Sequence, residues 1–139
     1  VDFEQDLAYA QTLDFPKDML TFTGEQTPHE VAQWMQQSDC FLFFSRYENA
    51  PVVLSECLAV GLPIISSNAG GIPEMINHEC GILVPSEDED ALAKALLHML
   101  DRTTIYDIAT IRSYGKQYTY ASIGRQLSEL SQGLIVSSH

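Results

Sequence analysis

The amino-acid sequence predicts an α/β fold, namely a Rossmann-like three-layer domain with a mainly parallel sheet. Short apolar runs rich in strand-forming residues, at positions 40–44, 63–66 and 81–84, alternate with segments of helical periodicity. That alternation is typical of a mainly parallel sheet covered by helices. With 139 residues, 45% of them hydrophobic and 19% charged, the chain has the size and composition of a globular protein, so we expect a single domain over residues 1–139.

The first forty residues contain two expected helices and one expected strand. Residues 4–13 have the pattern of an amphipathic helix, and Leu20 to Thr23 read as a short strand closed by Gly24. Thr27 to Glu30 form a capping box with proline at the first helical position, which predicts the start of a second helix.

The middle of the chain carries the expected sheet. The run Cys40 to Phe44 is apolar without alternation, which is typical of a central strand buried on both faces. A helix is expected from Pro51 until Gly61 stops it, and the strands Pro63 to Ser66 and Gly81 to Val84 follow. The rest of the chain is expected to be helical, at residues 87–100, 103–114 and 120–130.

The charge balance excludes several partners. The formal net charge is −12 with seven Lys and Arg residues, whereas nucleic acid and anionic lipid are bound through basic clusters. Cys40, Cys57 and Cys80 lack the spacing of a metal site, so we expect reduced structural thiols. No stretch has the length of a bilayer span, and residues 1–10 do not resemble a signal peptide, which together predict a cytoplasmic protein.

The helix that follows Pro51 contains one ionisable residue, Glu56. Its other residues are apolar nearly all the way round, which predicts a helix covered on most sides. A carboxylate in such surroundings needs a partner, and the two hydroxyl groups of a ribose would supply two donors. The alternative is that Glu56 lies at an exposed edge of the helix, as most glutamates do.

The amino end of the same helix is expected at the carboxyl end of the strand Cys40 to Phe44, where open α/β sheets bind their ligands. Free amides at Val52, Val53 and Leu54 would form an anion site there. A diphosphate fits such a site. Glu48, in the preceding loop, would face the group attached to that diphosphate, or it is simply a surface turn residue.

A second loop, Ser66 to Glu74, follows the next buried strand at the same edge of the sheet. Its paired glycines, Gly70 and Gly71, allow positive φ and a close approach of the backbone to a ligand. A plain turn explains the same pair of glycines, so the pair indicates a ligand site only in combination with the first loop.

Taken together, these segments resemble a known family. Ser45-Arg46-Tyr47-Glu48, with Glu56 eight positions after Glu48, is followed by Gly61-Leu62-Pro63-Ile64-Ile65 and Gly70-Gly71-Ile72-Pro73-Glu74. This ordered set is similar to that of the retaining glycosyltransferase family 4, also called glycosyl transferases group 1. The resemblance implies the C-terminal, donor-binding domain of a GT-B enzyme, and it extends over nearly the whole chain.

The resemblance also implies roles for individual residues, and those of the donor site are listed at the end of this paragraph. Glu56 would bind the ribose hydroxyls, and Glu48 would contact the donor sugar and act in catalysis. The loop at Gly24, with Glu25 and Gln26, would lie near the nucleobase. The donor would be a UDP- or GDP-sugar, with no cofactor and no bound metal. The implied donor-binding residues are Gly24, Gln26, Glu48, Asn49, Ala50, Val52, Val53, Leu54, Glu56, Gly70 and Gly71.

The sequence departs from the family pattern at its amino-terminal side. The family's first two strands of the donor domain, with the Arg and Lys that neutralise the diphosphate, are not found in it, and neither is the N-terminal acceptor domain. Asn49-Ala50 replaces a dipeptide that often contains glycine. We therefore expect an incomplete GT-B C-terminal domain that is inactive alone and whose exposed sheet edges favour self-association. The acceptor domain of the same parent chain would be its partner and would place it at the inner face of the membrane.

Two other classes of protein are compatible with part of this pattern. A nucleotide-sugar epimerase of GT-B architecture would bind the same donor without an acceptor. A non-catalytic, doubly wound regulatory module would not depend on Glu56. A hydride-transferring Rossmann enzyme is disfavoured because no GxGxxG motif opens a helix.

Overall fold

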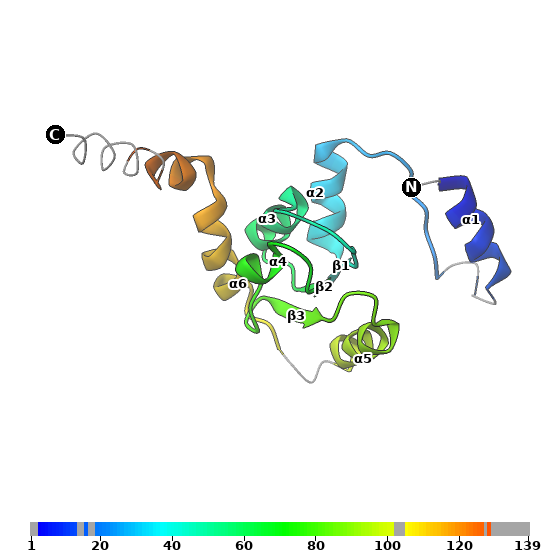
Figure 1. Ribbon diagram of the computed structural model, residues 1–139. Helices are drawn as coiled ribbons and strands as arrows, with labels where there is room; N and C mark the ends of the chain where they lie inside the picture. Colours follow the sequence, from blue (N-terminus) through cyan, green and yellow to red (C-terminus); the bar gives the residue numbers. More distant parts are fainter. Residues whose placement is uncertain (1–2, 14–15, 17–18, 102–104, 127, 129–139) are drawn as a thin grey trace. The chain divides into compact units, whose positions relative to one another are not determined.

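The computed structural model describes residues 3–13, 16, 19–101, 105–126 and 128 (Figure 1). The chain divides into two compact units, residues 1–31 and 32–139, and each is described by itself. The predicted α/β class is confirmed, because helices alternate with three parallel strands. The prediction of one domain over residues 1–139 stays a prediction.

The first unit contains the helix α1 (Phe3–Thr12), as predicted, and the start of the helix α2 (Pro28–Gln37). The capping box is confirmed, since the backbone amide of Thr27 donates to Glu30 Oε2 at 2.8 Å and the Glu30 amide donates to Thr27 Oγ1 at 3.4 Å. The predicted strand Leu20 to Thr23 is wrong. The sheet in the described parts of the chain consists of three later strands and does not include this segment, whose Leu20 and Phe22 side chains are exposed.

The second unit is built on a parallel sheet of β1 (Phe41–Phe43), β2 (Ile64–Ser67) and β3 (Gly81–Val84), in that spatial order. Every residue of β2 is buried, and its register places Ile64 beside both Phe41 and Gly81. The prediction that Cys40 to Phe44 is a central strand buried on both faces is wrong. Among the described residues β1 pairs only with β2, and Leu42 is 43% exposed because β1 forms an edge of the sheet.

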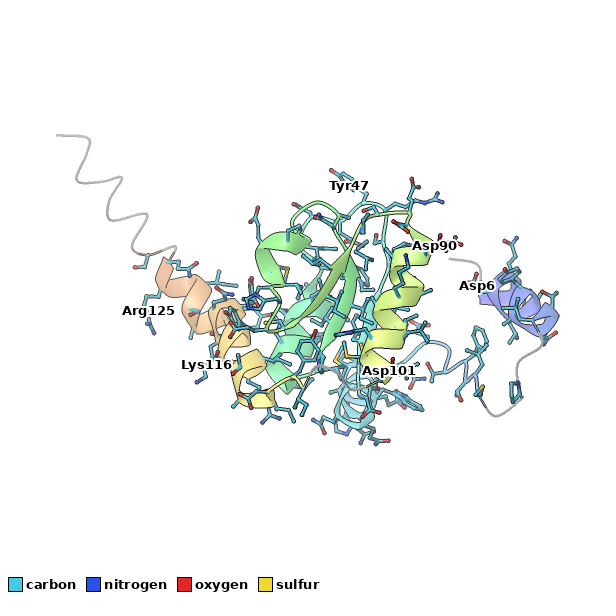
Figure 2. All side chains as sticks on the ribbon, turned by 90° about the horizontal axis from the view of Figure 1, so that it is seen from below. Asp6, Tyr47, Asp90, Asp101, Lys116 and Arg125 are labelled. Carbon is cyan, nitrogen blue, oxygen red and sulfur yellow. The ribbon has the colours of Figure 1, made fainter. Side chains whose placement is uncertain are left out.

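Helices cover both faces of this sheet (Figures 1 and 2). The helix α5 (Glu89–Leu100) packs on β2 and β3, where Ala95 joins Ile65 and Val84 in a buried cluster. The helices α3 (Val52–Val60) and α6 (Ile108–Gly115) pack against each other and lie with the short helix α4 (Ile72–Met75) on the other side. This arrangement is the predicted three-layer architecture.

Local signals set most of the helix ends. Gly61 ends α3 with a left-handed φ of 80°, as predicted. The helix α5 begins at Glu89 instead of Glu87, because the side chain of Asp88 accepts the Ala91 amide at 2.8 Å.

Two further helices were expected towards the end of the chain. The one expected from Thr103 begins at Ile108, after the cap Asp107, and Thr103 itself lies outside the described residues. The short 3-10 helix η1 (Lys116–Tyr118) follows α6. Residues 120–126 are helical as predicted, while the expected end at Leu130 lies outside the described residues.

The three cysteines are free thiols that line the interior, as predicted. Cys57 and Cys80 are buried and Cys40 is half-buried. Burial raises the pKa of all three, that of Cys57 to about 12, so they stay neutral at physiological pH. Within the described residues, no group of three or more His, Cys, Asp or Glu side chains is arranged to hold a metal ion.

None of the helices in the described parts of the chain combines the length and the apolar content that a bilayer span requires.

Asp107 should make the stability of the second unit depend on pH. Its side chain accepts the hydroxyl of Thr110 at 2.6 Å and the Thr110 amide at 2.9 Å, and these bonds lower its pKa. A carboxyl group whose pKa is lower in the folded state stabilises the fold above the unfolded pKa of about 4, and that contribution is lost as the pH falls through the folded pKa.

We therefore expect Asp107→Ala to lower the melting temperature at pH 7 and to approach the wild type as the pH falls through the folded pKa of Asp107, as measured by circular dichroism. The control is Asp101→Ala, because Asp101 is the C-cap residue of α5, and a carboxylate at the carboxyl end of a helix gains nothing from the helix dipole. A difference from wild type that stays constant with pH would contradict the role of the Asp107 carboxylate.

Candidate functional site

Three loops meet at the carboxyl edge of the sheet, because all three strands point the same way. They comprise residues 44–51 after β1, 68–71 after β2 and 85–88 after β3. The second and third loops are joined where the Asn68 amide donates to Val84 O at 2.7 Å and the Ser86 hydroxyl donates to Asn68 O at 3.3 Å. Figure 2 shows Tyr47 and Asp90 at this end of the unit and Asp101 and Lys116 at the opposite end.

Two fully buried serines at the end of β2 hold the end of β1. The Ser66 hydroxyl donates to Phe43 O at 2.9 Å. The Ser67 hydroxyl accepts the Ser45 amide at 3.0 Å and donates to Ser45 O at 2.5 Å. Sequence reasoning missed these serines as site residues, although paired hydroxyls at the end of an apolar strand are a readable signal because buried polar groups need partners.

Glu48 is half-buried and held by its surroundings. The Ser45 hydroxyl donates to Glu48 Oε1 at 3.2 Å, and the Gly71 amide donates to Glu48 O at 3.4 Å. Gly70 and Gly71 lie directly against the neighbouring loop, and their approach to a ligand stays a prediction. A Cβ on Gly70 would overlap the Glu48 carbonyl, and one on Gly71 would overlap the Asn49 carbonyl, so the pair accommodates the neighbouring loop. Gly70 also has a φ of 54°.

Glu56 lies in different surroundings from those expected. It is exposed, and it shares one stripe of α3 with Val52, which is 70% exposed, and with the exposed Ala59. The prediction that α3 is covered on most sides is confirmed, because its other six residues are buried or half-buried, with Leu54 and Leu58 in the core. Glu56 nevertheless lies on the one exposed stripe of the helix. The alternative interpretation, an exposed glutamate, is the one the structure supports, so burial gives no argument for an external partner.

The amino end of α3 offers two free amides instead of three. Pro51 caps the helix without a side-chain hydrogen bond, and the Leu54 amide donates to Pro51 O at 3.1 Å. Within the described part of the chain, the amides of Val52 and Val53 have no hydrogen-bond partner. The predicted anion site thus retains these two donors and the positive end of the helix dipole.

The remaining predicted site residues lie partly in the first loop and partly in the first unit. Asn49 and Ala50 are exposed at the end of the first loop. Gly24, with a φ of 67°, and Gln26 belong to the first unit, where the Gln26 side chain donates to Thr23 O at 2.7 Å. Their expected place near a nucleobase stays a prediction.

The carboxyl edge is mostly acidic. Arg46 is the single basic residue in its three loops, and its Nε lies 2.9 Å from Glu87 Oε1. The two side chains are 86% and 65% exposed, so the pair contributes at most about 1 kcal/mol and Arg46 is accessible to another anion.

A cavity of about 790 Å³ lies at the opposite end of the strands, lined in part by Asp39, Leu62 and Pro63. Ligands of open parallel sheets bind at the carboxyl ends, so this cavity is not the candidate site.

Comparison with known proteins agrees with this fold. The family model for glycosyl transferases group 1 matches residues 4–102. The chain therefore belongs to that family, and its structural neighbours are GT-B glycosyltransferases. This membership favours a glycosyltransferase over the epimerase and the regulatory module.

Individual relatives show how much of a longer protein the match covers. The Salmonella typhimurium protein WcaL, named for colanic acid biosynthesis, is 32% identical over 127 residues, which are 84% of this chain and 31% of WcaL. The sucrose-phosphate synthase of Thermosynechococcus elongatus has a TM-score of 0.70 at 28% identity over 97% of this chain and 34% of its own. Anabaena HepE in complex with UDP-glucose has a TM-score of 0.77 at 22% identity, over 95% and 37%. The chain thus spans about a third of the length of such proteins.

Gly70→Ala tests whether the glycine pair holds the first loop in place. A left-handed φ costs an alanine about 1–2 kcal/mol, and overlap with the Glu48 carbonyl adds to that cost. We expect unfolding in urea to show a loss of more than about 2 kcal/mol. Gly24→Ala is the control, because Gly24 has a similar φ and open space around the added Cβ. Equal losses in both variants would show that contact with the loop is unimportant.

Proposed function

We propose that this chain is the donor-binding part of a retaining glycosyltransferase that moves a sugar from a nucleoside-diphosphate donor to a saccharide or lipid-linked acceptor in polysaccharide or glycoconjugate synthesis. One observation carries the proposal. The held carboxylate of Glu48 and the free amides of Val52 and Val53 lie within five residues of each other at the carboxyl edge of the sheet. A hydroxyl-binding acid beside an anion-binding helix end matches the two parts of a sugar diphosphate.

Each part of the donor has a proposed contact. The amides of Val52 and Val53 bind the diphosphate, as helix amino ends bind phosphates elsewhere. Glu48 accepts hydroxyls of the sugar, next to the reacting carbon, and is the proposed catalytic residue. Glu56, exposed one turn further along α3, accepts the ribose hydroxyls. Gly70, Gly71, Asn49 and Ala50 shape the rim of this site.

The diphosphate leaves with its charge increased, and stabilising that charge is the main electrostatic task of such catalysis. In the three loops Arg46 alone is basic, among several carboxylates. We therefore propose that further cations and the acceptor site come from an acceptor domain of the same parent chain, at the cytoplasmic face of a membrane. This chain alone would bind donors weakly and transfer no sugar, and it would use neither a cofactor nor a metal.

Titration with nucleotide-sugars tests the proposal. UDP-glucose and GDP-mannose are suitable probes, since HepE was solved with the first and a Mycobacterium tuberculosis relative is named for its dependence on the second. At millimolar donor we expect NMR shifts in the amides of Val52, Val53 and Gly71. Glu56→Gln should weaken binding about tenfold, because the amide keeps one acceptor oxygen but loses the charge and replaces the second acceptor with a donor.

The control for Glu56→Gln is Glu89→Gln, which removes the same charge from the exposed first turn of α5. Undiminished binding in Glu56→Gln would remove the ribose role. Absence of binding to either nucleotide-sugar by the wild type would refute the proposed function.

Self-association through the edge strand β1 is also proposed. Leu42 is 43% exposed on a strand that pairs only with β2 among the described residues, and Phe44, directly after this strand, is 36% exposed. Unpaired, apolar strand edges favour pairing with another chain. Light scattering at rising concentration should show mass above that of one chain, and Leu42→Lys should reduce it. A monodisperse monomer at all concentrations would contradict this expectation.

A further inference from the structure

The position of Glu48 depends on a series of contacts that begins inside the protein. Glu48 itself is only half-buried, and its carboxylate accepts from the Ser45 hydroxyl, whose oxygen lies 3.2 Å from Glu48 Oε1. The single proton of that hydroxyl is shared with Tyr47 O, 3.3 Å away. Ser45 is in turn fixed by a residue of a different strand, 22 positions later in the chain. The geometry of the proposed sugar-binding carboxylate is therefore set from β2.

That residue is Ser67, whose hydroxyl bonds Ser45 in both directions. Ser67 Oγ accepts the Ser45 amide at 3.0 Å and donates its own proton to Ser45 O at 2.5 Å. One hydroxyl thus satisfies both backbone groups of the residue at which β1 turns into the first loop. Ser67 is fully buried, and its backbone is fixed by the register of β2 with β3, so the anchor itself is rigid.

We propose that Ser67 is a positioning residue for the donor sugar, which acts through Ser45 on the carboxylate of Glu48. This inference rests on the proposed function and adds to it the residue that sets the site for the sugar half of the donor. The amides of Val52 and Val53 belong to α3, which is held by its own packing on α6. Loss of the Ser67 hydroxyl should therefore impair recognition of the sugar and leave that of the nucleoside diphosphate intact.

The neighbouring serine provides a matched control. Ser66 is equally buried, and its hydroxyl also crosses to β1, but it bonds Phe43 O at 2.9 Å, within the strand and before the loop begins. Ser66→Ala and Ser67→Ala remove the same atom from adjacent buried positions. A general effect of losing a buried hydroxyl would be the same in both variants.

The measured quantity is the ratio of two affinities, UDP-glucose over UDP, obtained by NMR titration of the full chain, with GDP-mannose over GDP as the second pair. We expect Ser67→Ala to lower this ratio about threefold to tenfold while the affinity for UDP stays within about twofold. Ser66→Ala should leave the ratio unchanged. Ser45→Ala should lower the ratio as Ser67→Ala does, because it removes the hydroxyl that donates to Glu48. Ser45 is only half-buried, so this variant keeps the test valid if Ser67→Ala does not fold.

The series of contacts also makes a prediction about coupling. If Ser67 acts through Glu48, then Glu48→Gln should lower the ratio, and adding Ser67→Ala to it should lower the ratio no further. Additive losses in the double variant would overturn the inference. So would an unchanged ratio in both Ser67→Ala and Ser45→Ala together with a lowered ratio in Glu48→Gln. Either result would leave the proposed function standing. A wild-type chain that binds neither nucleotide-sugar would overturn both.

Discussion

The second unit depends on β2, the one strand of the described sheet with a neighbour on each side. All four of its residues are buried, and it pairs in parallel with β1 and with β3. Parallel pairing brings the three carboxyl ends to one edge, and a fully buried strand cannot leave its polar side chains without partners. Ser66 and Ser67 satisfy that requirement on the backbone that leaves β1. The demand for hydrogen bonds in the core thereby orders the loop that carries Glu48.

The same loop is held from its other side by backbone contact. Gly70 and Gly71 let the second loop lie directly against the carbonyls of Glu48 and Asn49, which any side chain would prevent. The two loops therefore behave as one layer over the edge of the sheet, tied to the third loop through Asn68. Such contacts hold the loops before any ligand binds, and prior ordering of this kind lowers the entropy lost on binding.

The two glutamates that the sequence singles out differ from expectation in their surroundings, because Glu48 is the more buried of the two and Glu56 is exposed. Glu48 is the one with defined partners and partial burial. Glu56 is exposed on a stripe of α3 that also leaves Val52 uncovered. Apolar residues nearly all round a helix indicate that most of it is covered, but which stripe stays exposed depends on elements elsewhere in the chain. The role proposed for Glu56 therefore rests on family membership, whereas that proposed for Glu48 also has support from geometry.

The sequence by itself determined the features that arise within a few residues. The alternation of strands and helices, the capping box at Thr27 and the stop of α3 at Gly61 follow from local chemistry. The meeting of three loops at the carboxyl edge follows from the direction of parallel strands. Only the tertiary structure decided that Leu20 to Thr23 is not a strand, that β1 is an edge and that Glu56 is exposed. The hydrogen bond from Ser67 to Ser45 was likewise decided only by the tertiary structure, since it joins residues 22 positions apart. Pairing, burial and such bonds depend on neighbours distant in the chain, and no local pattern specifies them.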